Sequence, residues 1–119
     1  MRLFLPRSHI STDATVTKGR GGQIFLTNRA SFPVTLAYIK TTKGTLQEYR
    51  GMTREGKPRL SNESSEIPCD FILKPFYSHP VALIAKVDGV RYSFRAEMKR
   101  VQKDIDNEFL LLAHPIHPM

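Results

Sequence analysis

The sequence has one cysteine, Cys69, and no tryptophan among its 119 residues. A single cysteine cannot form a disulfide within the chain, so the fold cannot depend on oxidation. No apolar stretch approaches the roughly twenty residues that a membrane helix needs. The apolar run at residues 3–5 ends at Pro6 and is too short for a signal peptide. We therefore expect a cytoplasmic protein without a membrane partner, with a removed signal peptide as the alternative.

Residues with catalytic or metal-binding chemistry are also sparse. His9 lies in a predicted loop, His79 lies in a predicted turn, and both His114 and His117 lie in a proline-rich C-terminal stretch. None of these positions favours a base held against a nucleophile. His114 and His117 with a single cysteine fall short of a structural zinc site. The sequence therefore predicts a protein that is not an enzyme and has no cofactor or metal.

Two further groups of residues have compositions found in catalytic or phosphate-binding sites. Asp104, Asp106 and Glu108 form a cluster of acids, but it falls at a predicted turn facing solvent, whereas paired catalytic carboxylates line a pocket. The glycine-rich stretch 18–22 carries two cations but lacks the spacing and the Lys-Ser/Thr ending of a P-loop. We expect a hairpin loop there, with a phosphate cradle as the alternative.

Basic residues are in clear excess. Eighteen Lys and Arg residues against eleven Asp and Glu give a net charge of +7, which attracts acidic or phosphate-rich partners at long range. The length suits one domain. We expect a single domain over residues 1–113, followed by an extended, mobile tail over residues 114–119.

The stretch 80–98 gives the clearest structural prediction. Asp88-Gly89 suits a two-residue type I′ turn, and alternating apolar residues flank it on both sides. The cross-strand pairs of one face are then all apolar: Val87–Val90, Ala85–Tyr92, Leu83–Phe94 and Val81–Ala96. The other face carries Lys86, Arg91 and Arg95 and should meet water or a partner. Because a slip of one residue would bury these cations, the register should be well specified.

Further strands are predicted where β-branched or apolar residues alternate between turns rich in Gly, Pro and Asn. They cover residues 2–5, 12–18, 23–28, 34–42, 45–50 and 67–76. The segments 34–42 and 45–50, joined at Lys43-Gly44, are expected to pair as a second hairpin. In the segment 67–76, the alternation places Cys69 in the core as a small apolar residue rather than a nucleophile.

A resemblance supports the fold class. A glycine-led strand, an asparagine-containing bend, a proline and a second apolar strand follow one another in GQIFLTNRASFPVTL, within residues 22–39. This order resembles the start of immunoglobulin-like domains such as those of pilus-assembly chaperones, and it implies fold class alone. We predict an all-β domain, an antiparallel β-sandwich of about seven short strands with immunoglobulin-like or related topology.

The C-terminal stretch 100–113 fits two structures. Its apolar residues lie at helical spacing, which would suit an amphipathic helix. Alternatively, residues 104–107 have turn chemistry and residues 108–113 form a closing strand that pairs with the central hairpin. We favour the strand.

Residues 51–66 are polar and long for a loop, so we expect either a functional excursion or a mobile connection, with residues 57–60 pairing briefly as an edge strand. Our functional hypothesis is a macromolecular interaction module with a scaffold or assembly role. Its partner would be a protein with an acidic or edge-strand surface, or a second copy of the chain, and nucleic-acid phosphates are the alternative. The predicted basic surface consists of Arg50, Arg54, Lys57, Arg59, Lys86, Arg91, Arg95 and Lys99.

Both basic groups also have purely structural explanations. The stretch 51–66 would then be a solvated loop. The cations of the hairpin would protect a sheet edge from unwanted pairing. Against nucleic acid, Tyr92 and Phe94 are expected to face the core, whereas single-strand binders interleave aromatic side chains with cations.

Overall fold

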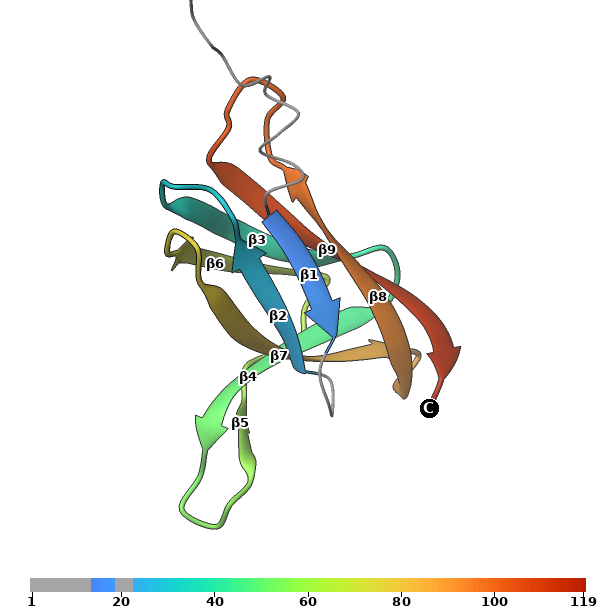
Figure 1. The fold of residues 1–119 in the computed structure, drawn as a ribbon. Coiled ribbons are helices and arrows are strands. Elements are labelled where there is room, and N and C mark those ends of the chain that lie inside the picture. The colour runs from blue at the N-terminus through green and yellow to red at the C-terminus, as the bar shows by residue number, and fades with distance from the viewer. Residues whose placement is uncertain (1–13, 19–22) are drawn as a thin grey trace, which may run out of the picture.

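Nine strands and no helix make up the described part of the chain (Figure 1). The computed structural model describes residues 14–18 and 23–119. The strands are β1 (Ala14–Lys18), β2 (Gln23–Asn28), β3 (Val34–Thr41), β4 (Thr45–Met52), β5 (Pro58–Leu60), β6 (Glu66–Leu73), β7 (Ser78–Val87), β8 (Val90–Arg100) and β9 (Glu108–Pro118). The edge strand predicted at residues 2–5 and the glycine-rich loop at 19–22 lie outside the described residues. Within the described ranges, no helix has the length and apolar character needed to cross a membrane.

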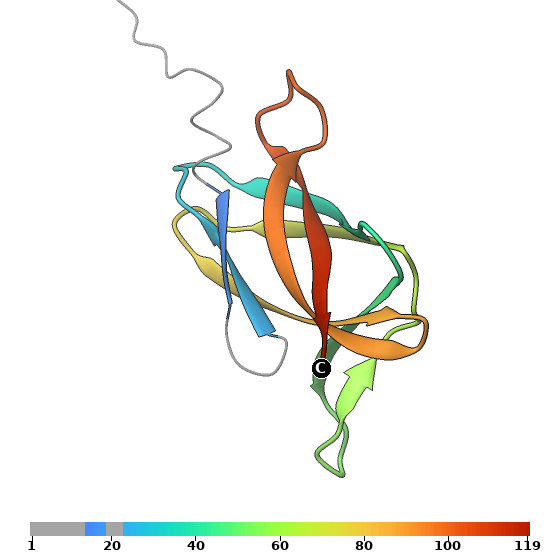
Figure 2. The same cartoon turned by 90° about the vertical axis from the view of Figure 1, so that its right-hand side faces the viewer.

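The strands form one sheet that curls into a half-barrel (Figures 1 and 2). Its order is β1-β2-β7-β8-β9-β3-β6, with β4 paired to β7 and β5 paired to β4. All ladders are antiparallel except that between β3 and β9, which is parallel. The all-β prediction is confirmed. The purely antiparallel arrangement is wrong, and the described residues form nine strands rather than the expected about seven.

The parallel ladder has a simple physical basis. β3 and β9 both alternate inward apolar residues with partly exposed ones. Ile39 of β3 pairs with Leu111 of β9, and both side chains are fully buried. Two strands with this alternation can bury the same residues whether they run in the same or in opposite directions. Apolar alternation therefore predicts the strands but not the direction of their pairing.

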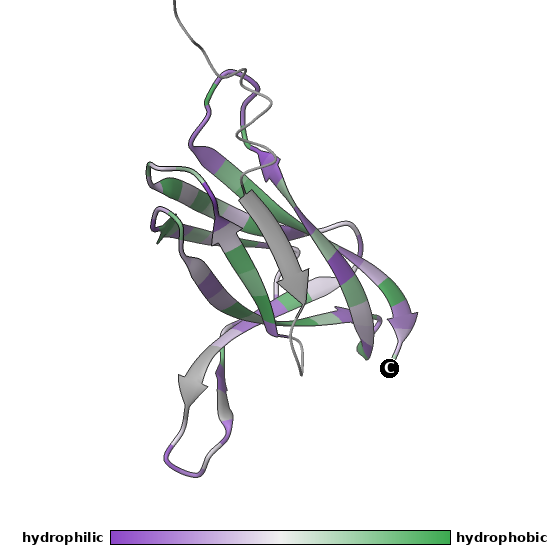
Figure 3. Cartoon of the chain, in the orientation of Figure 1, coloured by the Kyte–Doolittle hydropathy of each residue, from purple (hydrophilic) through white to green (hydrophobic). Residues whose placement is uncertain are grey.

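A single cluster of buried apolar side chains fills the concave side of the sheet. Figure 3 shows apolar residues alternating with polar ones along most strands. Among the described residues, the largest fully buried side chain is that of Phe109 on β9, and burying a side chain of this size stabilises the fold by about 1.5–3 kcal/mol. The cluster consists of Ile24, Leu26, Val34, Leu36, Ile39, Leu46, Ile67, Leu73, Val81, Leu83, Ala85, Phe94, Phe109, Leu111 and Ala113.

The turn at Asp88-Gly89 forms as predicted. Both residues have positive φ, 51° and 78°, as a type I′ turn requires. The predicted register is found in three pairs: Val87–Val90, Lys86–Arg91 and Ala85–Tyr92. Beyond these pairs the two strands diverge, because β7 continues against β2 and β4 whereas β8 continues against β9.

The prediction of a longer β7–β8 ladder is therefore wrong. Leu83 pairs with Glu48 of β4, and Phe94 pairs with Pro115 of β9. Both apolar side chains are nevertheless buried, as expected. Val90, which was expected on the apolar face, is 48% exposed. The alternation of apolar residues therefore predicted most of the inward-facing residues of β7 and β8, but it did not predict their cross-strand partners.

The second predicted hairpin is also wrong. Among the described residues, β3 pairs with β6 and β9, and β4 pairs with β5 and β7, so these consecutive strands do not pair with each other. The turn between them contains Gly44 at a φ of 73°. A Cβ on Gly44 would collide with the carbonyl oxygen of Lys86. The close approach of two backbones therefore requires glycine at this position.

β6 forms an edge of the sheet, with β3 as its neighbour in the described structure. Cys69 is half-buried against the core cluster, so its predicted core-facing position is confirmed. Asp70 has a φ of 48°, and the β3–β6 register shifts beside it. Pro68 lacks an N–H to donate. A proline and a bulge are common protections of an exposed edge against pairing with another chain.

The strand predicted near the C-terminus is confirmed. Residues 101–107 form a connection in which Asp106 lies 3.7 Å from Arg100, between Oδ1 and Nη1. β9 then pairs antiparallel with β8. β9 ends at Pro118 rather than at residue 113, and Pro118 pairs with Tyr92. Residues 114–118, predicted as a tail, therefore belong to the ladder.

Candidate functional site

Residues 50–60 project from the sheet as a two-stranded arm formed by the end of β4 and by β5 (Figures 1 and 2). The N–H of Thr53 donates to the carbonyl of Lys57 at 2.6 Å, and the N–H of Gly56 donates to the carbonyl of Thr53 at 2.9 Å. Gly56 has a φ of 82°, which glycine adopts without strain. The predicted excursion is therefore a hairpin, and the predicted short edge strand within it is confirmed as β5.

The arm carries an excess of positive charge. Arg54, Lys57 and Arg59 are exposed, and none of them forms an ion pair with a described residue. Residues 50–60 contain four basic residues and one acid, Glu55, and their net charge is +3 (four minus one). The arm is therefore the part of the predicted basic surface with the least local neutralisation.

Two arginines occupy opposite positions in the arm. Arg50 of β4 is the register partner of Arg59 of β5.

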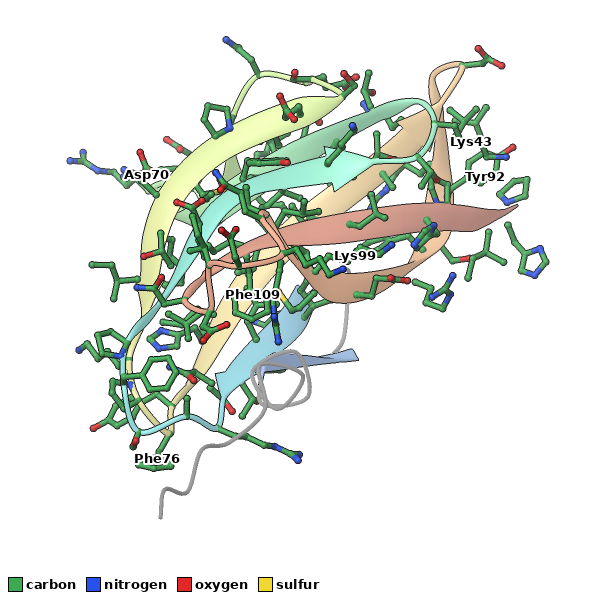
Figure 4. The ribbon with its side chains drawn as sticks, turned by 90° about the horizontal axis from the view of Figure 1, so that it is seen from above. Lys43, Asp70, Phe76, Tyr92, Lys99 and Phe109 are labelled. Atoms are coloured by element: carbon green, nitrogen blue, oxygen red, sulfur yellow. The ribbon has the colours of Figure 1, made fainter. Side chains whose placement is uncertain are left out.

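β8 carries the second basic surface. Arg91, Arg95 and Lys99 lie four residues apart along the strand and are exposed, and Figure 4 shows Lys99 on this strand. Glu97 lies within reach of the last two. Its Oε2 is 3.1 Å from Arg95 Nη1, and its Oε1 is 3.6 Å from Lys99 Nζ. We call Arg91, Arg95, Glu97 and Lys99 the β8 strip.

The carboxylate of Glu97 offsets much of the charge of the β8 strip. The hydrogen bond from Arg95 lowers the pKa of Glu97, and His114 and Lys99 lower it further, although partial burial acts in the opposite direction. His114 Nε2 lies 3.1 Å from Glu97 Oε2. Because Glu97 is ionised near neutral pH, it neutralises one of the two cations beside it. The β8 strip therefore offers less free charge than its sequence predicted.

Lys86 is also paired within the chain. Its Nζ donates to Oε1 of Glu63 at 2.7 Å, and the hydroxyl of Thr45 donates to the other carboxylate oxygen at 3.0 Å. These two hydrogen bonds, with Lys86 the larger influence, lower the pKa of Glu63. Lys86 was predicted to contact a partner, but its charge is already opposed by a carboxylate.

The arm and the β8 strip lie apart. Lys86 pairs with Thr45 on one side and with Arg91 on the other, so the beginning of β4 lies close to the β7–β8 turn. The arm begins at the other end of β4, five residues further along the strand, which corresponds to roughly 16 Å. The structure therefore brings Lys86 and Arg91 together and places the arm on a separate projection.

Two of the histidines, His79 and His114, have side-chain partners within the described chain. His79 Nε2 accepts the N–H of Lys74 at 3.0 Å, and its ring packs edge-on against Phe71 at 5.2 Å between centroids. Burial, and secondly the charge of Lys74, lower the pKa of His79. Residues 14–18 and 23–119 contain no group of three His, Cys, Asp or Glu side chains that could hold a metal ion.

Comparisons with known proteins leave the function open. No protein-family model matches this chain. No curated protein and no solved structure matches it either. The function therefore has to be inferred from the chemistry of the surfaces themselves.

Two turns carry exposed aromatic side chains that the sequence analysis did not single out. Phe32, between β2 and β3, is 37% exposed. Phe76 and Tyr77, between β6 and β7, are 68% and 59% exposed. Figure 4 shows Phe76 at the periphery of the molecule. The available signal was an aromatic residue next to a proline: Phe32 before Pro33 in a predicted turn, and Phe76 after Pro75 at the end of the predicted strand 67–76.

Proposed function

We propose that the protein is a non-enzymatic interaction module that binds an acidic surface of a partner protein, with the arm as the principal contact. The observation that carries the proposal is a projecting hairpin with a net charge of +3 (four cations minus one acid), in which Arg54, Lys57 and Arg59 are exposed and form no ion pair with a described residue. Guanidinium groups suit bidentate pairing with carboxylates. Carboxylates of a partner would neutralise the positive charge of the arm.

The β8 strip has a secondary role in this proposal. The net charge of +7 attracts an acidic partner at long range from every side of the molecule. At contact, however, a partner would have to compete with Glu97 for Arg95 and Lys99, which lie 3.1 and 3.6 Å from its carboxylate oxygens. The strip therefore contributes more to the rate of association than to the affinity.

Nucleic acid is the second candidate partner, because arginine binds phosphate as well as carboxylate. A phosphate chain is best bound by a continuous row of free cations. Glu97 interrupts the row on β8, and the arm strand β5 is only three residues long. These observations favour a compact acidic surface over an extended phosphate backbone.

The experiment compares two variants that each lose three positive charges. The arm variant carries Arg54→Gln, Lys57→Gln and Arg59→Gln, and the strip variant carries Arg91→Gln, Arg95→Gln and Lys99→Gln. Binding of poly-L-glutamate and of poly(U) is measured at graded salt concentrations. Because exposed substitutions change stability by only about 0.5 kcal/mol, thermal unfolding should confirm that both variants remain folded.

We expect the arm variant to bind polyglutamate about tenfold more weakly than the wild type, and the strip variant to lose clearly less affinity. Equal losses in the two variants would mean that net charge alone determines binding, which would contradict the proposed role of the arm. Tighter binding of poly(U) than of polyglutamate at every salt concentration would favour the nucleic-acid candidate instead.

The sandwich architecture is also part of this proposal. Apolar residues of β2 and β7 share one buried cluster with those of β3 and β9, as the inner faces of two packed sheets do. We infer that the half-barrel is a relative of the β-sandwich in which β7 joins the two halves. An experimental structure with two facing layers about 10 Å apart would support this, and a closed barrel would contradict it.

A further inference from the structure

One end of the molecule carries an exposed group of aromatic and basic side chains. Phe32 and Arg29 belong to the turn between β2 and β3, and Lys74, Phe76 and Tyr77 belong to the turn between β6 and β7. We call these five residues the aromatic tip. All five are exposed. Contiguous exposed apolar side chains are uncommon on monomeric proteins and mark interaction sites.

The two turns are fastened to each other by one buried side chain. Asn28 is fully buried, and its Nδ2 donates to the carbonyls of Phe32 at 2.9 Å and Leu73 at 3.0 Å. The N–H of Asn28 also donates to the carbonyl of Tyr77 at 3.0 Å. These bonds keep the two turns side by side, so the aromatic side chains project from adjacent turns that are held in place.

The conformation of Phe76 is costly for the isolated chain. Its φ is 60°, a left-handed conformation that a bulky residue rarely adopts and that costs of the order of 1–3 kcal/mol. The side chain is 68% exposed, so burial within the chain offsets little of this cost. Strain of this kind persists where the surrounding structure holds a side chain in place for a function.

Two cations accompany the aromatic side chains, one in each turn. Neither Arg29 nor Lys74 forms an ion pair with a described residue. Lys74 Nζ lies 5.8 Å from the centroid of the Tyr77 ring. Aromatic side chains beside lysine and arginine match the interface of an anionic bilayer, where rings enter the headgroup region and cations contact the phosphates.

We propose that the aromatic tip is a peripheral binding site for anionic lipid membranes. Phe32, Phe76 and Tyr77 would enter the interfacial region, while Arg29 and Lys74 would contact the lipid headgroups. The site differs from the arm, so it would add a membrane-targeting function to the protein-binding function. It also departs from the sequence-based expectation of no membrane partner, which rested on the absence of long apolar runs.

The contacts of Tyr77 favour lipid over single-stranded nucleic acid. Its ring already has the ammonium of Lys74 at 5.8 Å and the ring of His79 at 6.2 Å as neighbours. These neighbours compete with a base for stacking on the ring. Insertion into a bilayer interface, in contrast, requires only that the outward-facing edge of each ring is accessible to the lipid.

The test is co-sedimentation of the full chain with two kinds of vesicles. One kind contains phosphatidylcholine and phosphatidylserine, and the other contains phosphatidylcholine alone. The variants are Phe76→Asn, Tyr77→Ser and the double variant Arg29→Gln/Lys74→Gln. Asparagine tolerates a positive φ, so Phe76→Asn removes the ring without destabilising the turn. Leu60→Ser is the matched control, because Leu60 is 52% exposed but lies on the arm.

We expect the wild type to bind the phosphatidylserine vesicles, and Phe76→Asn and Tyr77→Ser each to weaken binding about tenfold. The double cation variant should show a reduced preference for phosphatidylserine, and Leu60→Ser should bind like the wild type. Absence of wild-type binding, or equal weakening by Leu60→Ser, would overturn the proposal. Binding of oligo(dT) that depends on Phe76 and Tyr77, without vesicle binding, would assign the tip to nucleic acid instead.

Discussion

At the scale of single residues, Gly44 occupies a position where only glycine fits without strain or collision. It combines a φ of 73° with a backbone contact to Lys86 that leaves no room for a Cβ. Gly44→Ala should therefore lower the free energy of unfolding by about 2–4 kcal/mol, measured by urea denaturation.

Gly56→Ala is the matched control for this substitution. Gly56 has a φ of 82°, but a Cβ there would meet nothing within 4 Å. Only backbone strain is then added, and the expected loss is about 1 kcal/mol. Equal losses for Gly44→Ala and Gly56→Ala would contradict the close approach of the turn to β7.

His79 should make stability depend on pH. Its pKa is lowered in the folded protein, mainly by burial, whereas in the unfolded chain it titrates near about 6.5. As the pH falls below that value, the unfolded chain takes up a proton that the folded state resists, so stability is lost. Protonation would also remove the acceptor for the N–H of Lys74.

Unfolding midpoints measured from about pH 7 to about pH 5 should therefore decrease in the wild type. His79→Gln keeps a side-chain acceptor but cannot titrate, so its midpoints should decrease less over this range. Parallel curves for the two proteins would show that His79 does not contribute. The carboxylates with lowered pKa, Glu63 and Glu97, act only at lower pH.

At the scale of strands, residues 114–118 test whether the end of β9 is structural. They pair with residues 92–95 of β8, and one of these, Phe94, is buried. Removing residues 114–119 should lower the free energy of unfolding by about 2–4 kcal/mol, because ladder bonds and burial are lost together. Ile116→Ser, at a side chain that is 46% exposed, should be nearly neutral in the same urea denaturation. An unchanged midpoint for the truncated chain would restore the prediction of a free tail.

Local chemistry determined which strands and turns could be predicted. Asp88-Gly89 and the alternation around it gave the correct turn, three correct cross-strand pairs and most of the inward residues. The prediction of a β3–β4 hairpin was wrong although Lys43-Gly44 has the chemistry of a turn. Gly44 is needed because the turn passes close to the backbone of Lys86 on β7, and β3 and β4 pair with other strands. Pairings between strands far apart in sequence depend on the whole core, and alternation does not encode them.

The sequence predicted which basic residues belong to the candidate site, but not which of them are neutralised by nearby carboxylates. The sequence identified the cations of the arm and of β8. The ion pairs of Lys86 with Glu63, and of Arg95 with Glu97, depend on side-chain geometry. The aromatic tip was missed because its two turns lie more than forty residues apart in the sequence and meet through Asn28. Exposure of an aromatic residue in a turn follows from tertiary packing rather than from local pattern.

At the scale of the whole molecule, some surfaces have cations that are paired with carboxylates and others have cations that are not. The chain has a net charge of +7, but Glu63 and Glu97 oppose the cations of β7 and β8, and the arm keeps its charge exposed. The aromatic tip adds a second exposed surface with different chemistry. We therefore expect separate variants of the arm and of the tip to affect separate partners.

The most direct measurement of the central claim is a titration of the ¹⁵N-labelled protein with poly-L-glutamate, followed by amide chemical shifts. If the arm is the principal acidic-partner site, the largest shift changes will fall on residues 53–60, and residues 91–99 will change little. Changes centred on residues 91–99, with the arm unaffected, would contradict the account.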